Sequence, residues 1–173
     1  MINIVFDVES DGPIIGYHSM ISFGAVVLKE GLKETFYSEL KPIGDNYVKD
    51  ALAVSGFTRE DTLKFKDAEL VMKEFDNWLL KINPTNDRLN FWSDNNGYDF
   101  PWIQWYCLTF NGINRLGHSS NNIRNVFNGM NRDMKKSFKH LRKTKHTHNA
   151  LDDAIGNAEA LLAMSKMGMK NLC

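Results

Sequence analysis

The chain has 173 residues, 43% of them hydrophobic and 12% aromatic, and its formal net charge at pH 7 is zero. This length and composition are typical of one globular domain and exclude a disordered protein. A neutral chain neither indicates nor excludes a polyanionic substrate, because an acidic centre with a basic rim also sums to zero. The apolar runs are too short to span a membrane, and Cys107 and Cys173 give no disulfide framework. Because a signal-peptide pattern is also absent, we expect a single domain over residues 1–173 in the reducing cytoplasm.

Three strands are predicted in the first forty residues. Residues 2–8 begin with an apolar run that is typical of a buried strand, and residues 20–29 and 33–40 are rich in β-branched and aromatic side chains. The connections between these strands are short, and the first contains Gly12 and Pro13, which mark a turn. We therefore expect an antiparallel meander.

The remaining predicted elements alternate helices with one more strand. Helices are expected at about 47–55 and over 67–82, where apolar residues recur every three or four positions. A fourth strand, 89–93, follows this helical crossover and is expected to run parallel to the first strand. Helices at about 101–111, opened by a proline in its first turn, and at about 149–166 complete the chain. The sum is an α/β domain in which helices flank a mixed sheet.

The candidate functional residues are acids and a histidine at three places. Asp7 and Glu9 lie two apart on the first strand and so share a face; Asp99 follows the fourth strand; His148 and Asp153 bracket the start of the last helix. Each motif alone also fits a structural role: a polar strand end, an Asx-rich turn, or a carboxylate at a helix dipole. Brought together, however, four carboxylates repel one another unless cations hold them. Hard oxygen ligands suit Mg²⁺ or Mn²⁺, and two such ions about 3.5–4 Å apart are the usual means of cutting phosphodiesters.

In order and spacing, these motifs resemble those of the DEDDh branch of the DnaQ-like 3′→5′ exonucleases. The Asp-Val-Glu at 7–9 resembles the family's Asp-x-Glu, residues 94–99 its His-Asn-x-x-Phe-Asp, and residues 148–154 its His-x-Ala-x-x-Asp-Ala. The resemblance covers nearly the whole chain and implies a ribonuclease H-like fold. Two positions depart from the pattern: Ser10 replaces the usual threonine and keeps its hydroxyl, and Asp94 replaces the usual histidine, which leaves the substrate preference open.

The resemblance implies a role for each motif residue. Asp7, Glu9 and Asp153 would hold one divalent ion. Asp7 and Asp99 would hold a second, so that two Mg²⁺ or Mn²⁺ ions are the expected cofactors. His148 would be the general base that takes a proton from the attacking water.

The implied activity is release of nucleoside 5′-monophosphates from single-stranded 3′ ends, including 3′ overhangs, with RNA slightly favoured. A single-stranded DNA exonuclease is the alternative. A non-catalytic nucleic-acid binding module is disfavoured by the complete acidic set, and a phosphodiesterase of dinucleotides by the basic stretch described next. Because several small members of the family are homodimers, the resemblance also allows a homodimer.

Further residues are candidates for substrate contact. No acid occurs between Asp133 and Asp152, where a basic stretch predicts contacts with the phosphate backbone; a solvated charged segment is the alternative. This basic stretch comprises Lys135, Lys136, Lys139, Arg142, Lys143 and Lys145, with His140 and His146. In the first loop, where relatives wedge an apolar side chain against the terminal base, Ile14 or Ile15 is the matching residue. Trp105 and Tyr106 are interpreted as core rather than as a base-stacking platform. The substrate candidates are Ser10, Ile14, Ile15, Asp94, Asn95, Lys135, Lys136 and Lys139.

Overall fold

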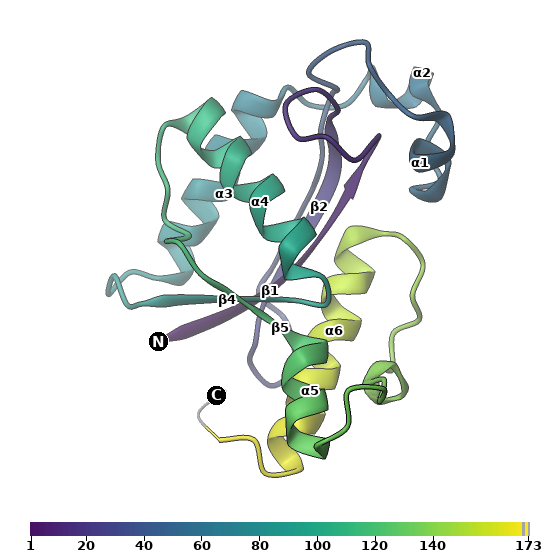
Figure 1. Ribbon diagram of the computed structural model, residues 1–173. Helices are drawn as coiled ribbons and strands as arrows, with labels where there is room; N and C mark the ends of the chain where they lie inside the picture. The colour runs from purple at the N-terminus through teal and green to yellow at the C-terminus, as the bar shows by residue number, and fades with distance from the viewer. Residues whose placement is uncertain (171, 173) are drawn as a thin grey trace.

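A five-stranded mixed sheet forms the centre of the protein in the computed structural model, which describes residues 1–170 and 172 (Figure 1). The strands are β1 (Ile2–Ser10), β2 (Met20–Val27), β3 (Thr35–Glu39), β4 (Leu89–Ser93) and β5 (Ser120–Asn122). Their spatial order is β3-β2-β1-β4-β5. β2 is antiparallel to both β1 and β3, whereas β4 is parallel to both β1 and β5. The predicted meander and the parallel fourth strand are therefore confirmed.

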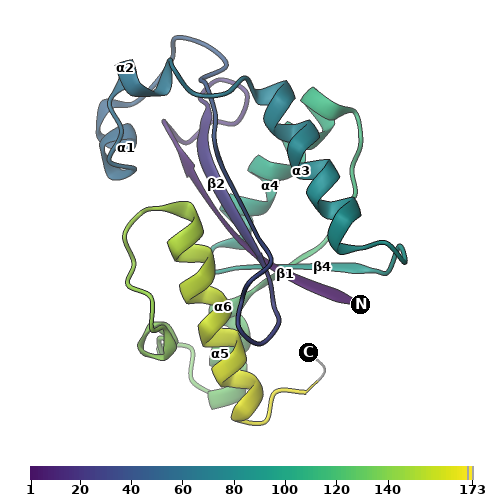
Figure 2. The same ribbon diagram turned by 180° about the vertical axis from the view of Figure 1, so that it is seen from behind.

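Helices cover both faces of this sheet (Figures 1 and 2). They are α1 (Lys49–Val54), α2 (Arg59–Thr62), α3 (Ala68–Ile82), α4 (Asn96–Tyr106), α5 (Ile123–Asn131) and α6 (Ala150–Lys166), with a π-helical turn η1 (Cys107–Asn111) and a 3₁₀ turn η2 (Lys139–Leu141). α3 and α4 pack on one face, and α5 and α6 on the other. The short helices α1 and α2 lie near the carboxyl end of β1 (Figure 1). Among the described residues, no helix is both long and apolar enough to cross a bilayer.

The alternation of side chains along β1 separates two cores and decides where its acids point. Ile4 and Phe6 belong to the core under α3 and α4, whereas Val5 belongs to the core under α5 and α6. Because side chains on a strand alternate with a period of two, Asp7 and Glu9 face the same side as Val5. The acids of β1 therefore point toward the layer that contains α6.

The prediction that Pro101 opens the helix expected at about 101–111, which is α4 in the structure, is wrong. α4 begins at Asn96, five residues before Pro101, which lies inside the helix. The carbonyl of Asn95 accepts hydrogen bonds from the backbone N–H groups of Tyr98 and Asp99, at 2.8 and 3.0 Å, so the helix is already formed when the proline is reached. Pro101 then removes one backbone donor without ending the helix. As a result, Asp99 lies in the first turn of α4 rather than ahead of it.

β5 and α5 are among the elements that have no counterpart in the prediction from sequence, as are the short α2 and η2. β5 has the sequence Ser-Asn-Asn, which contains no apolar residue that could signal a strand. It forms because β4 leaves an open edge that Ser120–Asn122 complete by parallel pairing. α5 follows directly, and Asn122 caps it by accepting a hydrogen bond from the backbone N–H of Asn125 at 2.8 Å. The sheet edge therefore decides β5, whereas α5 begins at a local cap that β5 supplies.

Candidate active site

A close approach between α6 and β2 assembles the acidic cluster. Gly24 of β2 is paired with Asp7 of β1, and a Cβ atom at Gly24 would lie 2.4 Å from the Cα atom of Leu151 in α6. Only glycine therefore allows the first turn of α6 to lie this near the strands. That turn carries Asp153, and one carboxylate oxygen from each of Asp7, Glu9 and Asp153 lies within 4.8 Å of the others.

Asp99 reaches the cluster from the other side of β1, in the first turn of α4. Its side chain is buried, and its charge raises the pKa of both Asp7 and Glu9. The four acids predicted from the sequence are thus brought together from one strand and the first turns of two helices. The structure thus shows that the four side chains are neighbours; their individual roles are taken up below as proposals.

Burial and repulsion from neighbouring carboxylates raise the pKa values of Asp7, Glu9 and Asp99. Desolvation is the largest cause at Asp7, where the charges of Asp99, Glu9 and Asp153 act in the same direction and raise the pKa well above its ordinary value. Desolvation and the charges of Asp153 and Asp99 raise the pKa of Glu9 to about 8. The pKa of Asp99 rises to about 7, again mainly through desolvation. Groups that are strained as anions and offer hard oxygen atoms form a donor set that fits a divalent cation.

The metal-free protein should lose stability as the pH rises. The folded-state pKa values of Glu9 and Asp99 lie above their ordinary values, so between about pH 4.5 and about pH 8 the folded protein holds protons that the unfolded chain has released. The stabilising contribution is complete below the ordinary pKa values and disappears once the pH exceeds the folded ones. Urea unfolding in EDTA from about pH 5 to about pH 8 measures this fall. A divalent ion should weaken the dependence, whereas a flat or rising profile in EDTA would contradict the repulsion.

Three groups hold the carboxylate of Asp153. Its side chain is 1% exposed, and its Oδ1 atom accepts from Arg142 Nη2 at 2.6 Å and lies 2.8 Å from His146 Nδ1. Its Oδ2 atom accepts from the backbone N–H of His148 at 3.0 Å. Three groups from the segment just before α6 therefore fix the orientation of this carboxylate. Ligating carboxylates in metal sites are commonly held by such outer hydrogen bonds.

Arg142 and His146 have more specific places than the sequence indicated. Both belong to the basic stretch, which predicted only phosphate contact. The side chain of Arg142 is instead 6% exposed, and a Cβ atom at Gly156 would lie 2.4 Å from its Nε atom. Gly156 of α6 thus provides the space in which the guanidinium reaches Asp153. The glycine three residues after the motif aspartate was the signal that could have suggested a close neighbour.

Replacing Arg142 with methionine should destabilise the protein by about 3 kcal/mol, because it leaves the buried carboxylate of Asp153 without its main cationic partner. Urea unfolding at fixed pH measures the change. The matched control is Lys143→Met, which removes an exposed charge from the adjacent position and should change stability by no more than about 0.5 kcal/mol. Equal stabilities for the two variants would contradict the role given to the Arg142–Asp153 pair.

His148 lies at the mouth of the cluster in an unusual backbone conformation. Its φ angle is 58°, in the left-handed region that L-residues rarely adopt. Its side chain is 45% exposed, and its Nδ1 atom lies 3.8 Å from Glu9 Oε1. The backbone strain is held by the hydrogen bond to Asp153, and it directs an exposed imidazole over the acids. Strain of this kind concentrates at functional sites.

The candidates in the first loop have different environments. Ser10 is buried, and its Oγ atom lies 2.7 Å from the carbonyl oxygen of Gly12 and 2.5 Å from the hydroxyl of Tyr98. Its hydroxyl therefore joins the loop to α4. Ile15 packs against the core, whereas Ile14 is 56% exposed and is the one of the two that is free to touch a ligand.

The candidates of the second motif and of the basic stretch are connected by an ion pair. Asp94 is half-buried, and its Oδ2 atom lies 3.8 Å from the Nζ atom of the exposed Lys139. Asn95 is exposed at the start of α4, and Lys135 and Lys136 are exposed before η2. The Asp94–Lys139 pair connects the second motif to the basic stretch, so part of that stretch lies beside the motif, as expected.

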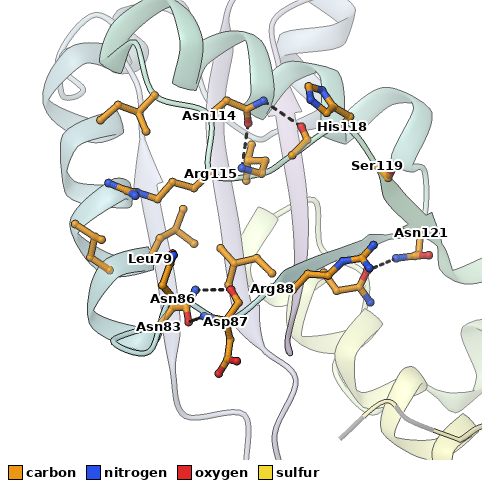
Figure 3. A pocket seen from close by; sticks show the side chains of 16 residues that line it. Leu79, Asn83, Asn86, Asp87, Arg88, Asn114, Arg115, His118, Ser119 and Asn121 are labelled. Carbon is orange, nitrogen blue, oxygen red and sulfur yellow. Dashed lines mark hydrogen bonds between the residues drawn. The ribbon is translucent and has the colours of Figure 1, made fainter.

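A concavity lies at the end of the sheet opposite to the acidic cluster. This cavity of about 600 Å³ is formed by the end of α3, the start of β4 and the loop before β5 (Figure 3). Its lining contains one acid, Asp87, among asparagine, arginine and aliphatic side chains. Carboxylates that could share a metal ion are gathered at the carboxyl end of β1 and not in this cavity. We therefore assign the candidate active site to the acidic cluster.

Known proteins resemble this chain in sequence and in fold. The model of the exonuclease family RNase_T matches residues 4–161. The 3′-5′ DNA exonuclease Cap18 of Escherichia coli is 30% identical over 177 residues, which cover 95% of this chain and 91% of that protein. The nuclease domain of 3′hExo, a DEDDh family member bound to rAMP, has a TM-score of 0.76 at 16% identity, over 96% of this chain and 92% of that one.

Two further solved structures are longer than this chain. Cell-death related nuclease 4 has a TM-score of 0.75 at 19% identity, over 96% of this chain and 64% of that one. E. coli exonuclease I, in a zinc-bound complex with single-stranded DNA, has a TM-score of 0.72 at 14% identity, over 99% of this chain and 41% of that one. The chain thus spans less than two thirds of the length of either protein, and at these identities the likeness is one of fold.

The fold and the acidic cluster define a nuclease of the ribonuclease H-like class. Because the family model covers most of its length and a curated relative is 30% identical across 95% of it, the chain belongs to the exonuclease family RNase_T. It is a DnaQ-like 3′→5′ exonuclease, as the motif resemblance predicted. Enzymes of this family depend on divalent metal ions, which agrees with the oxygen donors of the cluster.

Proposed function

We propose that this enzyme degrades single-stranded DNA from its 3′ end and releases nucleoside 5′-monophosphates. The observation that carries the choice of DNA is the 30% identity to a DNA exonuclease over nearly the whole of both chains. This reverses the slight preference for RNA that the motifs alone suggested. The structural neighbours include proteins studied with RNA and with DNA, so their folds do not favour either substrate.

The acidic residues would act by holding cations. Asp7, Glu9 and Asp153 offer oxygen atoms that converge within 4.8 Å, which supports one shared ion. Asp99 approaches Asp7 closely enough to raise its pKa, which supports a second ion held by these two residues. Two Mg²⁺ or Mn²⁺ ions would supply positive charge beside the scissile phosphate and the leaving 3′-oxygen. Arg142 would keep Asp153 in its ligating orientation.

His148 would act as the general base. Its half-exposed imidazole lies beside Glu9 at the mouth of the cluster, where an attacking water has to enter. The left-handed backbone at His148 holds the ring there. Ile14, exposed in the loop after the first motif, would contact the terminal base, and Lys135, Lys136 and Lys139 would contact phosphates farther along the strand.

Degradation of 5′-labelled oligonucleotides tests the proposed function. Single-stranded DNA, RNA of the same sequence, and a duplex with a 3′ overhang are incubated with Mg²⁺, Mn²⁺ or EDTA. We expect a ladder that shortens from the 3′ end, is fastest on single-stranded DNA and is absent in EDTA. Faster loss of RNA would overturn the substrate assignment, and internal cleavage would overturn the exonuclease mechanism itself.

Removal of the three lysines should weaken binding more than turnover. In Lys135→Gln/Lys136→Gln/Lys139→Gln, fewer phosphates are neutralised, so the slope of log Kd against log salt should flatten by about 0.7 for each lost contact with a single strand. Fluorescence anisotropy with labelled DNA over a range of salt concentrations measures this slope. The matched control is Lys64→Gln/Lys66→Gln/Lys73→Gln, which removes three exposed charges near α2 and α3 and should leave it unchanged.

A further inference from the structure

A pair of histidines lies against Asp153 and forms with it a second donor set, to which the proposed hydrolysis gives no function as a metal site and in which it does not use His146. The rings of His146 and His148 are 4.2 Å apart between centroids. His146 Nδ1 lies 2.8 Å from Asp153 Oδ1. One ring nitrogen from each histidine and one oxygen of Asp153 all lie within 4.8 Å of one another. This group shares only Asp153 with the all-oxygen group that contains Asp7 and Glu9.

We propose that His146, His148 and Asp153 bind a divalent transition-metal ion of the zinc class, which inhibits the exonuclease by withdrawing His148 and Asp153 from hydrolysis. The binding follows from the donor set and its geometry. The inhibition rests, in addition, on the proposed function and on the roles given there to these two residues.

The choice of metal follows from the chemistry of the ligands. Imidazole nitrogen suits Zn²⁺, Cu²⁺ and Ni²⁺, whereas Mg²⁺ prefers carboxylate, carbonyl and water oxygen. Two imidazoles and one carboxylate therefore select a transition metal, and the three carboxylates beside them select Mg²⁺ or Mn²⁺. Among divalent first-row metals, affinity for a mixed nitrogen and oxygen site rises from Mn²⁺ to a maximum at Cu²⁺, and Zn²⁺ lies below Cu²⁺ but above Mn²⁺. A low concentration of Zn²⁺ can thus compete at Asp153 with a larger concentration of Mg²⁺.

The geometry permits an ion with a small movement of exposed side chains. Zinc lies about 2.0–2.2 Å from nitrogen and oxygen ligands in tetrahedral sites, which separates neighbouring ligand atoms by about 3.3 Å. The present separation between His146 Nδ1 and Asp153 Oδ1 is 2.8 Å, so the imidazole has to withdraw by about half an ångström. His146 and His148 are 44% and 45% exposed and can move. Glu9 Oε1, 3.8 Å from His148 Nδ1, is within reach as a fourth ligand.

The carboxylate, by contrast, is fixed before any ion arrives. Arg142 donates to Oδ1 of Asp153 at 2.6 Å, and the backbone N–H of His148 donates to Oδ2 at 3.0 Å. The carboxylate of Asp153 can therefore stay in place while the two imidazole side chains turn to bind the ion. A simple imidazole–carboxylate hydrogen bond between His146 and Asp153 is the competing explanation, and it predicts no contribution of His146 to metal affinity.

The first test follows the imidazole NMR signals of the five histidines of the wild-type chain while Zn²⁺ is added in the presence of Mg²⁺. We expect the signals of His146 and His148 to shift together at one equivalent of Zn²⁺, and those of His18, His118 and His140 to stay in place. Equal shifts at exposed His118 and His140, or no shift at His146, would overturn the site. This test requires no variant and so does not depend on how a substitution folds.

The second test compares His146→Gln with His118→Gln, which removes an exposed imidazole at the far end of the sheet (Figure 3). Calorimetric titration with Zn²⁺ should show affinity weakened at least about tenfold in His146→Gln and unchanged in His118→Gln. Titration with Mg²⁺ should give the wild-type affinity in both. Zn²⁺ should also be added to each protein while it degrades single-stranded DNA with Mg²⁺. In His146→Gln, the Zn²⁺ concentration that halves this rate should rise by the same factor as the dissociation constant for Zn²⁺.

The outcomes separate the new site from the proposed function. If Zn²⁺ binds through His146 but does not slow degradation of single-stranded DNA, the inhibitory half of the proposal is wrong. If the Mg²⁺-loaded protein degrades no nucleic acid, yet the His146 and His148 signals respond to Zn²⁺, the proposed function fails and the metal site stands. Equal Zn²⁺ affinities of His146→Gln and the wild type overturn the site itself.

Discussion

Replacing Asp7 with asparagine should lower the rate of 3′-end degradation by about 10³-fold or more and, at the same time, stabilise the metal-free protein. The loss of rate reflects several kcal/mol of transition-state stabilisation by cations that the variant no longer holds in place. The gain in stability follows from the raised pKa of Asp7, whose charge is buried beside Asp99, Glu9 and Asp153. Removing one repelling charge should raise the melting temperature in EDTA, by roughly 2–4 °C for each kcal/mol gained.

The opposite signs of these two effects make the prediction specific. An ordinary core substitution lowers both activity and stability. The matched control is Asp152→Asn, an identical chemical change one residue before Asp153, at a carboxylate whose Oδ2 atom accepts a hydrogen bond from Thr147 at 3.2 Å. It should change the rate by no more than about twofold. Retention of activity in Asp7→Asn, or a fall in its stability in EDTA, would show that Asp7 is not a strained metal ligand.

The sequence predicted those features of the site that depend on local spacing. Asp7 and Glu9 share a face because strand side chains alternate, and the resemblance of residues 148–154 to the family's His-x-Ala-x-x-Asp-Ala places its aspartate at Asp153 and not at Asp152. The structure agrees: Asp153 is buried within the cluster, whereas Asp152 bonds to Thr147 at the surface. Helix periodicity is also a local property. The long helices α3 and α6 accordingly begin and end within a residue of the expected positions.

Features that depend on neighbours distant in sequence could not be predicted in this way. In the sequence, Gly24 is an ordinary strand residue. In the structure, a Cβ atom at this position would lie 2.4 Å from the Cα atom of Leu151. In the sequence, Arg142 is one of several charges in a basic stretch. In the structure, the missing side chain of Gly156 leaves room for its guanidinium to bind Asp153. β5 is paired by the edge of β4 despite its polar sequence. In each case a tertiary contact, invisible to composition or periodicity, decides the outcome.

These contacts explain why a repulsive cluster persists in a folded protein. β1, α4 and α6 are held by two apolar cores, and the acids occupy the point where these elements meet. Packing in the two cores offsets the repulsion within the cluster. Of the four acids, and among the described residues, only Asp153 has a buried basic partner within hydrogen-bonding distance. The remaining negative charge is left for cations. Repulsion among the preorganised carboxylates lowers the stability of the metal-free protein and favours the binding of cations.

Replacing His148 with asparagine should reduce turnover by about 10²–10⁴-fold with little change in the affinity for single-stranded DNA. Asparagine adopts the left-handed backbone more readily than most residues, so the 58° φ angle and the backbone hydrogen bond to Asp153 should persist while the imidazole is lost. Single-turnover degradation with excess enzyme measures the chemical step, and anisotropy in Ca²⁺ measures binding.

The control for this substitution is His140→Asn, in the same basic stretch, where the imidazole packs against Phe127 at 5.8 Å between ring centroids. It should leave the chemical step within about twofold of the wild type. A positioning role for His148 predicts a different pattern: Kd for DNA would rise and melting temperature would fall in His148→Asn. If binding and stability are unchanged and the chemical step is slowed, the imidazole itself moves the proton; if all three are unchanged, proton transfer has to be assigned to another group.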